Sequence, residues 1–345
     1  MPNILNSMGQ QEHACQQSQR YCLCPGCDSD RTLDFGRCTV PVELSHSDAP
    51  AIIRQITEEL RESRLKKCHD CQLFFRWPQL SSDDLATLYQ NLPDAFWDYN
   101  AKEVGSWSQA RSILTSRYDT SESISILDVG AFDGAFLSLL SDRWRKFAIE
   151  PSPAGRGKLR ESNVQVIADF ATNLDLTQHV GRYDVVTLFD VFEHLPNPCQ
   201  TLDQLSLLVK PGGILLVSTG NAEHWSWRLL GGQQWYLHSA QHLCFATLPF
   251  FRRWATSSGM QVQSSVRHPH QIGSVRRRFV QSVETIHAWA KKTNRKRTLG
   301  LLYRIPGFRY LSHKQGITFT TSLHDHLMVV FEKPATNHSP ASQYS

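Results

Sequence analysis

Short apolar runs alternate with helical patterns through the larger part of the chain. Seven of these runs have the length and the β-branched content of buried strands, at 124–129, 146–150, 164–169, 183–190, 214–219, 260–266 and 325–333. Between them lie stretches with helical spacing, among them 135–145, 199–210 and 247–259. Strands that alternate with helices in this way predict an α/β fold with a mostly parallel sheet and helices on both faces.

Acidic residues end four of the predicted strands. These residues are Asp128, Glu150, Asp169 and Asp190. In open α/β sheets, ligands bind at the carboxyl ends of the strands. Gly130 and Gly134 follow the first strand and precede a helix, and glycines allow a loop backbone to approach a ligand closely. The pattern therefore predicts a ligand site at this edge of the sheet.

Three interpretations of the loop G-A-F-D-G (130–134) are open: a dinucleotide site, an S-adenosylmethionine site, or a tight turn without a ligand. A dinucleotide site uses G-x-G-x-x-G to hold a pyrophosphate at a helix N-terminus. Here the first close pair of glycines is missing, and Asp133 adds negative charge where phosphates would lie. S-adenosylmethionine carries a sulfonium and an ammonium group, so nearby carboxylates favour its binding.

Five motifs, in this order, resemble those of class I S-adenosylmethionine-dependent methyltransferases: ILDVGAFDG (126–134), FAIEPS (147–152), VIADF (166–170), FDVFEHLPNP (189–198) and LLVKPGGILLVST (207–219). The resemblance covers roughly residues 105–265 and the last strand. It implies a Rossmann-like fold with a mostly parallel, seven-stranded sheet.

The same resemblance implies roles for the acidic residues. Asp128 and Gly130 would line the methionine moiety, with Gly134 in the same cofactor loop. Glu150 would hold the ribose hydroxyls, Asp169 would approach the adenine amino group, and Asp190 would flank the methyl-transfer region.

Cysteines cluster near the N-terminus, where seven of the nine lie between Cys15 and Cys71. Two C-x-x-C pairs, Cys24 with Cys27 and Cys68 with Cys71, offer four thiolates, which suit tetrahedral zinc. Reduced cysteines without a metal and a redox pair are the competing interpretations. The pattern CPGC…KCHDCQLFFRWPQLSSDDLATLY resembles the N-terminal zinc-binding region of a methyltransferase group that includes C-methyltransferases of nucleotide-linked sugars. The resemblance implies zinc, and a saccharide or nucleotide sugar is the expected acceptor.

Histidine is the natural base near neutral pH for removing a proton from the acceptor. In the sugar C-methyltransferases the segment after the fifth strand resembles Y-x-E-H, and here it is Ser239-Ala240-Gln241-His242. Only the histidine matches, so we predict His242 as the base for an O-methyl transfer, or as a donor that orients the acceptor. His194 is the alternative, although a structural role in its loop is favoured.

Positive charge is concentrated in one segment. Residues 267–314 contain twelve Lys or Arg and a single acid, Glu284, in a chain of net charge +4. This segment precedes the last strand, and its first half is predicted to be helical. It either covers the substrate cleft or attracts an anion, such as a nucleotide diphosphate, an anionic membrane surface or a glycan. RNA is less favoured, because no nucleic-acid-binding module is evident.

The N-terminus lacks the apolar centre of a signal peptide, and no apolar run approaches a membrane span, so a cytoplasmic location is expected. The predicted organisation is a disordered tail (1–20), a zinc-binding subdomain (21–80), a helical connection (81–122), the methyltransferase core (123–266), a basic helical insertion (267–320), the last core strand (321–334) and a second tail (335–345). The alternatives to an enzyme acting on a small or carrier-linked acceptor are a non-catalytic S-adenosylmethionine-binding scaffold and an RNA methyltransferase.

Overall fold

The computed structural model describes residues 22–45, 50–91, 104–118 and 123–335. The predicted disordered tail at 1–20 lies outside these residues, as does nearly all of the tail predicted at 335–345. The strands are β1 (Thr32–Arg37), β2 (Arg64–Cys68), β3 (Phe74–Trp77), β4 (Ser125–Val129), β5 (Arg145–Ile149), β6 (Gln165–Ala168), β7 (Tyr183–Phe189), β8 (Val209–Gly220), β9 (Cys244–Phe245), β10 (Gln261–His268) and β11 (His326–Glu332). The α-helices are α2 (Val42–Ser45), α3 (Ala51–Glu58), α4 (Ser82–Asn91), α5 (Gly105–Arg117), α6 (Ala135–Ser138), α7 (Pro153–Glu161), α8 (Leu176–His179), α9 (Pro198–Leu208), α10 (Trp225–Leu230), α11 (Leu248–Ser258), α12 (Val275–Lys292) and α13 (Lys296–Arg304).

A seven-stranded sheet forms the centre of the molecule, in the order β10-β11-β8-β7-β4-β5-β6. The pairs from β8 to β6 are parallel, whereas β11 is antiparallel to both of its neighbours. The predicted mostly parallel sheet of seven strands is therefore confirmed, with one reversed strand. Because β11 runs in the opposite direction, it begins at the edge where the parallel strands end.

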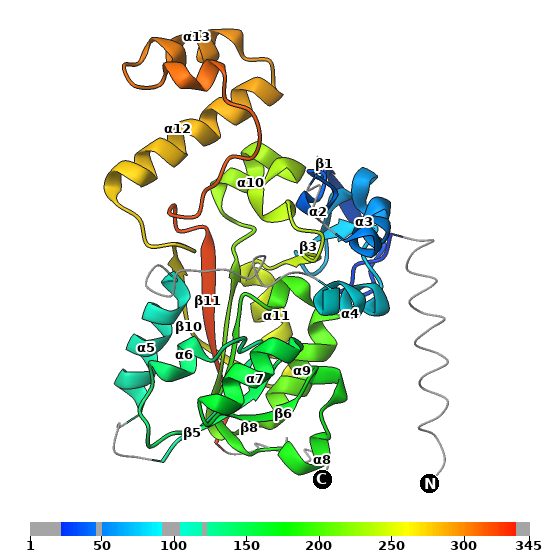
Figure 1. Ribbon diagram of the computed structural model, residues 1–345, viewed down its shortest axis with the longest axis vertical. Coiled ribbons are helices and arrows are strands. Elements are labelled where there is room, and N and C mark those ends of the chain that lie inside the picture. The colour runs from blue at the N-terminus through cyan, green and yellow to red at the C-terminus, as the bar shows by residue number, and fades with distance from the viewer. Residues whose placement is uncertain (1–21, 46–49, 92–103, 119–122, 336–345) are drawn as a thin grey trace, which may run out of the picture.

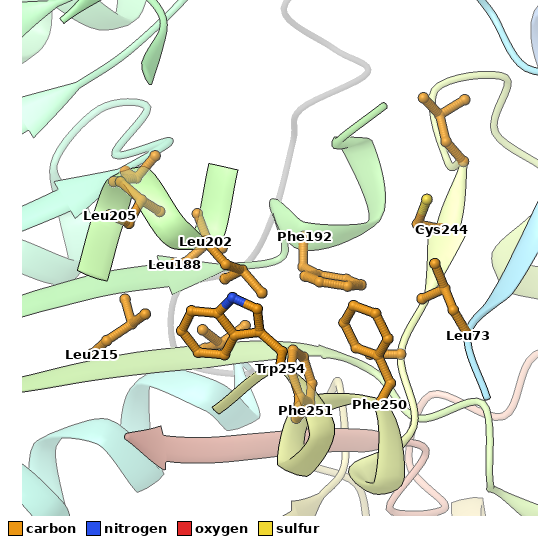
Figure 2. Packing of buried hydrophobic residues seen from close by; sticks show 14 of the residues in the cluster. Leu73, Leu188, Phe192, Leu202, Leu205, Leu215, Cys244, Phe250, Phe251 and Trp254 are labelled. Atoms are coloured by element: carbon orange, nitrogen blue, oxygen red, sulfur yellow. The ribbon is translucent and has the colours of Figure 1, made fainter. Parts of the chain in front are cut away.

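Strand residues alternate between two apolar layers, as the period of two requires. On one face α9 and α11 pack against the sheet, and Leu202, Phe251 and Trp254 lie together there (Figure 2). On the other face α5, α6 and α7 cover residues such as Ile126 and Val185. Both faces of the central strands β4 and β7 are thus buried, which explains why these two strands are largely apolar.

The helix predicted at 135–145 is wrong in its length, since α6 ends at Ser138 and residues 139–144 form turns. Trp144 is buried and its indole lies edge-on to Tyr118, with ring centroids 6.0 Å apart. Trp144 is thus packed in the core at the residue before β5 begins, although the sequence has helical spacing up to this point.

The cysteine-containing segment forms a second sheet, in the order β1-β2-β3-β9. Its fourth strand comes from the loop after β8, because Phe74 and Phe75 pair with Phe245 and Cys244. The N-terminal region is therefore joined to a loop of the core by backbone hydrogen bonds, and Cys244 lies beside Leu73 in the shared apolar layer (Figure 2).

The insertion consists of α12 and α13, which project from one end of the molecule (Figure 1). Val283, Leu302, Phe308 and Leu311 form a small apolar cluster between them. Within the described part of the chain, no helix has the length and apolar character needed to cross a membrane.

Candidate functional site

A cavity of about 710 Å³ opens at the carboxyl ends of the parallel strands. Six carboxyl groups line it, those of Asp83, Asp128, Glu150, Asp169, Asp190 and Glu193. Among the described residues that form its walls there is no Lys or Arg. The cavity therefore favours a cationic ligand and disfavours a phosphate.

Asp128 and Glu150 lie at the ends of β4 and β5, and each is only 4% exposed. Thr187 donates a hydrogen bond to Asp128 at 2.6 Å, and burial raises the pKa of Asp128 to about 7. The amides of Phe132 and Ser152 donate to the two oxygens of Glu150, at 2.6 and 2.7 Å. Burial raises the pKa of Glu150, although these two amides oppose the shift. The amides fix the Glu150 carboxylate in one orientation at the cavity wall.

Gly130 lines the cavity with φ +75°, and a Cβ atom there would lie 2.4 Å from the Val191 side chain. Only glycine accommodates both the positive φ and this contact. Gly134 is not among the residues that line the cavity. It precedes α6 with φ +76°, and a Cβ atom there would meet Leu159 at 2.9 Å, so its position serves the turn and the packing of α7.

Asp169 and Asp190 both line the cavity, following β6 and β7. Asn173 and the Phe170 amide donate to Oδ1 of Asp169, and the Asn173 bond lowers the pKa of this carboxyl. Asp190 has φ +53°, which is uncommon for a non-glycine residue and clusters at functional sites. Its Oδ1 lies 3.3 Å from Nε2 of His326.

His242 also reaches the cavity. Its Nδ1 lies 2.6 Å from the carbonyl oxygen of Tyr236. Because a carbonyl only accepts, Nδ1 carries the proton and Nε2 of the neutral ring has a free electron pair. Burial, together with the neighbouring His194, lowers the pKa of His242 well below its usual value. The ring is therefore neutral at pH 7, as a general base must be.

Glu193 and Tyr236 form a pair that the sequence interpretation did not identify. The Tyr236 hydroxyl donates to Oε1 of Glu193, and Thr219 donates to Oε2 at 2.8 Å. Burial, with the nearby Asp190 charge, raises the pKa of Glu193 to about 7. The Tyr236 and His242 rings lie 4.5 Å apart between centroids. A tyrosine, a carboxyl and a histidine thus meet here, although the local Y-x-E-H pattern lacks two of them.

Gly220 makes room for this pair at the end of β8. A Cβ atom at position 220 would lie 2.3 Å from the Tyr236 ring. The signal in the sequence was the glutamate of FEHLPNP together with the tyrosine of QQWYLH, but these residues lie 43 positions apart. No pattern of spacing along the chain connects them.

The four predicted metal-binding cysteines lie together, with all sulfur atoms within 4.8 Å of one another. Sγ of Cys24 is 3.5 Å from Cys71, and Sγ of Cys27 is 3.6 Å from Cys68. Zinc–sulfur bonds of 2.3 Å in a tetrahedron would place sulfurs about 3.8 Å apart, so the group has the dimensions of such a site. Amides of Gly26 and Asp70 donate to the sulfurs of Cys24 and Cys68, which stabilises thiolates. All described cysteines are free of disulfides.

Arg76 connects the cysteine region to the loop that carries His242. It belongs to β3 and is fully buried. Its guanidinium donates to the carbonyl of His242 at 3.1 Å and to that of Ser239 at 2.9 Å, and it also donates to the carbonyl of Leu237. The position of His242 therefore depends on β3 as well as on the core.

Comparison with known proteins agrees with this arrangement. Residues 96–265 match the family model of a methyltransferase domain. The ubiquinone biosynthesis O-methyltransferase of Escherichia coli O6:H1 is 28% identical over 155 residues, which are 43% of this chain and 64% of that protein. The protein of the same name from Cronobacter sakazakii is 30% identical over 116 residues, 31% of this chain and 48% of that protein. The match therefore spans less than two thirds of the length of these curated relatives.

Solved structures with a similar fold include an S-adenosylmethionine-dependent methyltransferase from Mesorhizobium loti, with a TM-score of 0.42, 11% identity, and coverage of 66% of this chain and 96% of that one. Another is coclaurine N-methyltransferase bound to N-methylheliamine and S-adenosylhomocysteine, with a TM-score of 0.37, 15% identity, and coverage of 66% and 71%.

The order of the strands and the cavity at their carboxyl ends define a Rossmann-like fold with a ligand site at the sheet edge. The family match identifies residues 96–265 as a methyltransferase domain, in agreement with the predicted S-adenosylmethionine-dependent class.

Proposed function

We propose that the protein transfers a methyl group from S-adenosylmethionine to an oxygen atom of a small-molecule or carrier-linked acceptor. The observation that carries the proposal is the cavity lined by six carboxyl groups and, among its described lining residues, by no Lys or Arg. A sulfonium and an ammonium group are attracted to such a site, whereas the pyrophosphate of a dinucleotide is repelled.

Four of the six carboxyl groups have a proposed part in cofactor binding. Glu150, already oriented by two amides, accepts hydrogen bonds from the ribose hydroxyls. Asp169 accepts from the adenine amino group through Oδ2, since both donors described above reach Oδ1. Asp128 and Gly130 line the methionine moiety, and Asp190 lies beside the transferred methyl group.

His242 is the proposed base. The acceptor hydroxyl gives its proton to Nε2 of His242, its oxygen forms a bond to the methyl carbon, and the carbon–sulfur bond breaks to leave neutral S-adenosylhomocysteine. Glu193 and Tyr236 share a hydrogen bond beside this ring and orient the acceptor. The two relatives described above are O-methyltransferases, and this favours oxygen as the acceptor atom.

A saccharide is the proposed acceptor. Trp235 and Tyr236 offer aromatic surfaces in the cavity, and Gln241 and His270 offer polar groups beside them. This combination suits a ring with an apolar face and hydroxyl groups at its edge. Because the described lining residues include no Lys or Arg, a diphosphate or other anionic carrier would remain outside the cavity.

Zinc is proposed at Cys24, Cys27, Cys68 and Cys71, where it would hold β2 and β3 in place. Its part is structural, because four thiolates leave no open coordination position. Through Arg76, the same region supports the loop of His242.

Residues 273–314 are proposed to bind an anionic membrane surface. Val275, Phe279 and Ile286 are 80%, 58% and 37% exposed on α12. Their spacing of four and seven residues puts them on one side of the helix. An exposed apolar stripe within a segment of strong positive charge is typical of helices that lie on anionic lipid, and this favours a lipid-linked acceptor.

The test uses deuterated S-adenosylmethionine, a metabolite and lipid extract, and mass spectrometry. We expect a product heavier by the labelled methyl group. His242→Asn should abolish its formation while S-adenosylhomocysteine binding, measured by calorimetry, is retained. Binding without transfer in the wild-type protein would support a scaffold, labelled RNA would support an RNA methyltransferase, and no binding would refute the proposal.

A further inference from the structure

A second group of potential ligands lies where three strands meet at the edge of the sheet. Asp190 follows β7, His270 follows β10, and His326 begins β11. One ligand atom from each residue lies within 4.8 Å of the other two. The reversed direction of β11 brings His326 to this edge, opposite Gly220 of β8 and His268 of β10.

The inner atoms of this group lack hydrogen-bond partners. His326 is 1% exposed, and both its Nε2 and Oδ1 of Asp190 are buried without a hydrogen bond. They lie 3.3 Å apart as an ion pair. Buried polar atoms are almost always hydrogen-bonded in proteins, so a buried ion pair in which neither atom makes a well-formed hydrogen bond leaves both atoms able to bind a metal ion.

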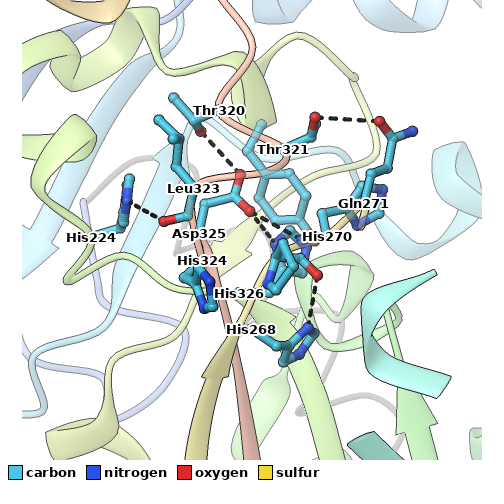
Figure 3. Close-up of polar contacts among 12 residues, drawn as sticks. His224, His268, His270, Gln271, Thr320, Thr321, Leu323, His324, Asp325 and His326 are labelled. Carbon is cyan, nitrogen blue, oxygen red and sulfur yellow. Dashed lines mark hydrogen bonds and ion pairs between the residues drawn. The ribbon is translucent and has the colours of Figure 1, made fainter. Parts of the chain in front are cut away.

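The outer ring nitrogen of His326, in contrast, has a carboxylate partner. Nδ1 of His326 lies 3.1 Å from Oδ1 of Asp325 (Figure 3). Asp325 in turn accepts hydrogen bonds from Trp235 at 3.1 Å, from the Thr320 hydroxyl at 3.0 Å and from the amide of His270 at 3.3 Å. A carboxylate behind a histidine is the usual second layer of a metal site, where it directs the other ring nitrogen at the metal.

We propose that Asp190, His270 and His326 bind a divalent first-row transition metal ion, which takes an oxygen atom of the acceptor as a further ligand. Two imidazoles and one carboxylate are a common set for such ions and leave coordination positions open. Ligand atoms about 2.1 Å from a metal and at right angles to each other lie about 3.0 Å apart, close to the observed 3.3 Å. The ion replaces the proton on Nε2 of His326, which passes to solvent.

The open positions would face the proposed methyl-transfer cavity, because Asp190 and His270 line it. An acceptor hydroxyl bound to the ion would lose its proton more easily, and its oxygen would be fixed beside the methyl donor. The binding of the acceptor oxygen to the ion rests on the proposed function. The binding of the ion by Asp190, His270 and His326 does not.

The experiment titrates the full-length protein, with its thiolate zinc retained, with Mn²⁺ at pH 8. Free Mn²⁺ is followed by electron paramagnetic resonance. Thiolates select softer metals, so Mn²⁺ reports sites of nitrogen and oxygen ligands, and the variants assign the bound ion to Asp190, His270 and His326 rather than to Glu193, His194 and His242. We expect one Mn²⁺ per chain, and at least tenfold weaker binding in His270→Gln and in His326→Gln. His268→Gln is the matched control, because His268 is a neighbouring buried histidine outside the group, and it should bind as the wild type does.

Water-proton relaxation then tests the open positions. Bound Mn²⁺ that keeps exchangeable water should enhance relaxation, and an unchanged rate would refute an open site. No stoichiometric Mn²⁺ binding, or binding that survives both His270→Gln and His326→Gln, would overturn the proposal and leave His326 as an imidazolium paired with two carboxylates. S-adenosylhomocysteine binding is measured in parallel: if it persists without Mn²⁺ binding, only the metal site fails, and if it is absent, the proposed function fails.

Discussion

Glu150→Ala should weaken binding of S-adenosylhomocysteine about 100-fold. The wild-type carboxylate would accept two hydrogen bonds from the ribose, and hydrogen bonds to a charged group contribute about 1.5–3 kcal/mol each. Both hydrogen bonds share one carboxylate, and in the variant water can bind the ribose hydroxyls in its place. We therefore take a loss of about 3 kcal/mol in binding free energy for the two bonds together, which corresponds to about 100-fold in Kd.

The same change leaves the amides of Phe132 and Ser152 without their acceptor, at a position that is 4% exposed in the wild type. Each unsatisfied buried amide costs about 1–3 kcal/mol, so the melting temperature should also fall. Calorimetry is therefore done well below the melting point of the variant, after circular dichroism has shown it to be folded. Asp142→Asn removes a fully exposed carboxylate before β5 and should alter neither quantity. A folded Glu150→Ala protein whose Kd stays within twofold of the wild type would refute the ribose role.

Three further predictions concern stability, coupling and membranes. The pKa of Asp128 is about 7 in the folded protein and about 4 in the unfolded chain, so the folded state binds a proton more tightly, and the stability that this group contributes is lost as the pH rises from 4 to 7. Asp128→Asn should therefore raise the melting temperature at pH 8 but not at pH 4. An equal change at both pH values would contradict the raised pKa of Asp128. Arg76→Lys should lower kcat at least tenfold with S-adenosylhomocysteine affinity within threefold, as should chelation of the proposed zinc ion. A parallel loss of affinity would count against separate support for the His242 loop. Phe279→Glu should reduce binding to phosphatidylglycerol vesicles in a flotation assay. Leu33→Glu is the control, because it places the same charge at a similarly exposed position on β1, and it should not reduce binding. Equal effects of the two variants would exclude α12 as the membrane-binding element.

The sequence predicted the core well, because the parallel strands are buried on both faces and therefore appear as continuous apolar runs. The acidic residues at the ends of β4, β5, β6 and β7 follow directly from such strands, so their meeting in one cavity could be expected. The length of α6 could not, because the segment has helical spacing as far as Arg145 whereas the helix ends at Ser138.

The sequence did not indicate that Glu193 and Tyr236 lie beside His242, for a different reason. Glu193 comes from the loop after β7 and Tyr236 from a turn after β8, and they meet only because Gly220 leaves space for the tyrosine ring. Likewise, His326 reaches Asp190 because the last strand is reversed, which depends on how the whole insertion returns to the sheet. Contacts of this kind are properties of the topology, and a search for local motifs does not detect them.

The two halves of the cavity therefore have different supports. The carboxylates proposed for the cofactor lie at the end of β4 or directly after β5, β6 and β7, so the large sheet positions them. The proposed base is held by Arg76 and by the pairing of β3 with β9, both of which belong to the cysteine-containing sheet. A disturbance of the N-terminal region should then change the reaction of the acceptor before it changes the affinity for the methyl donor. This order of effects would distinguish a cysteine region that positions the catalytic loop from one that only adds stability to the fold.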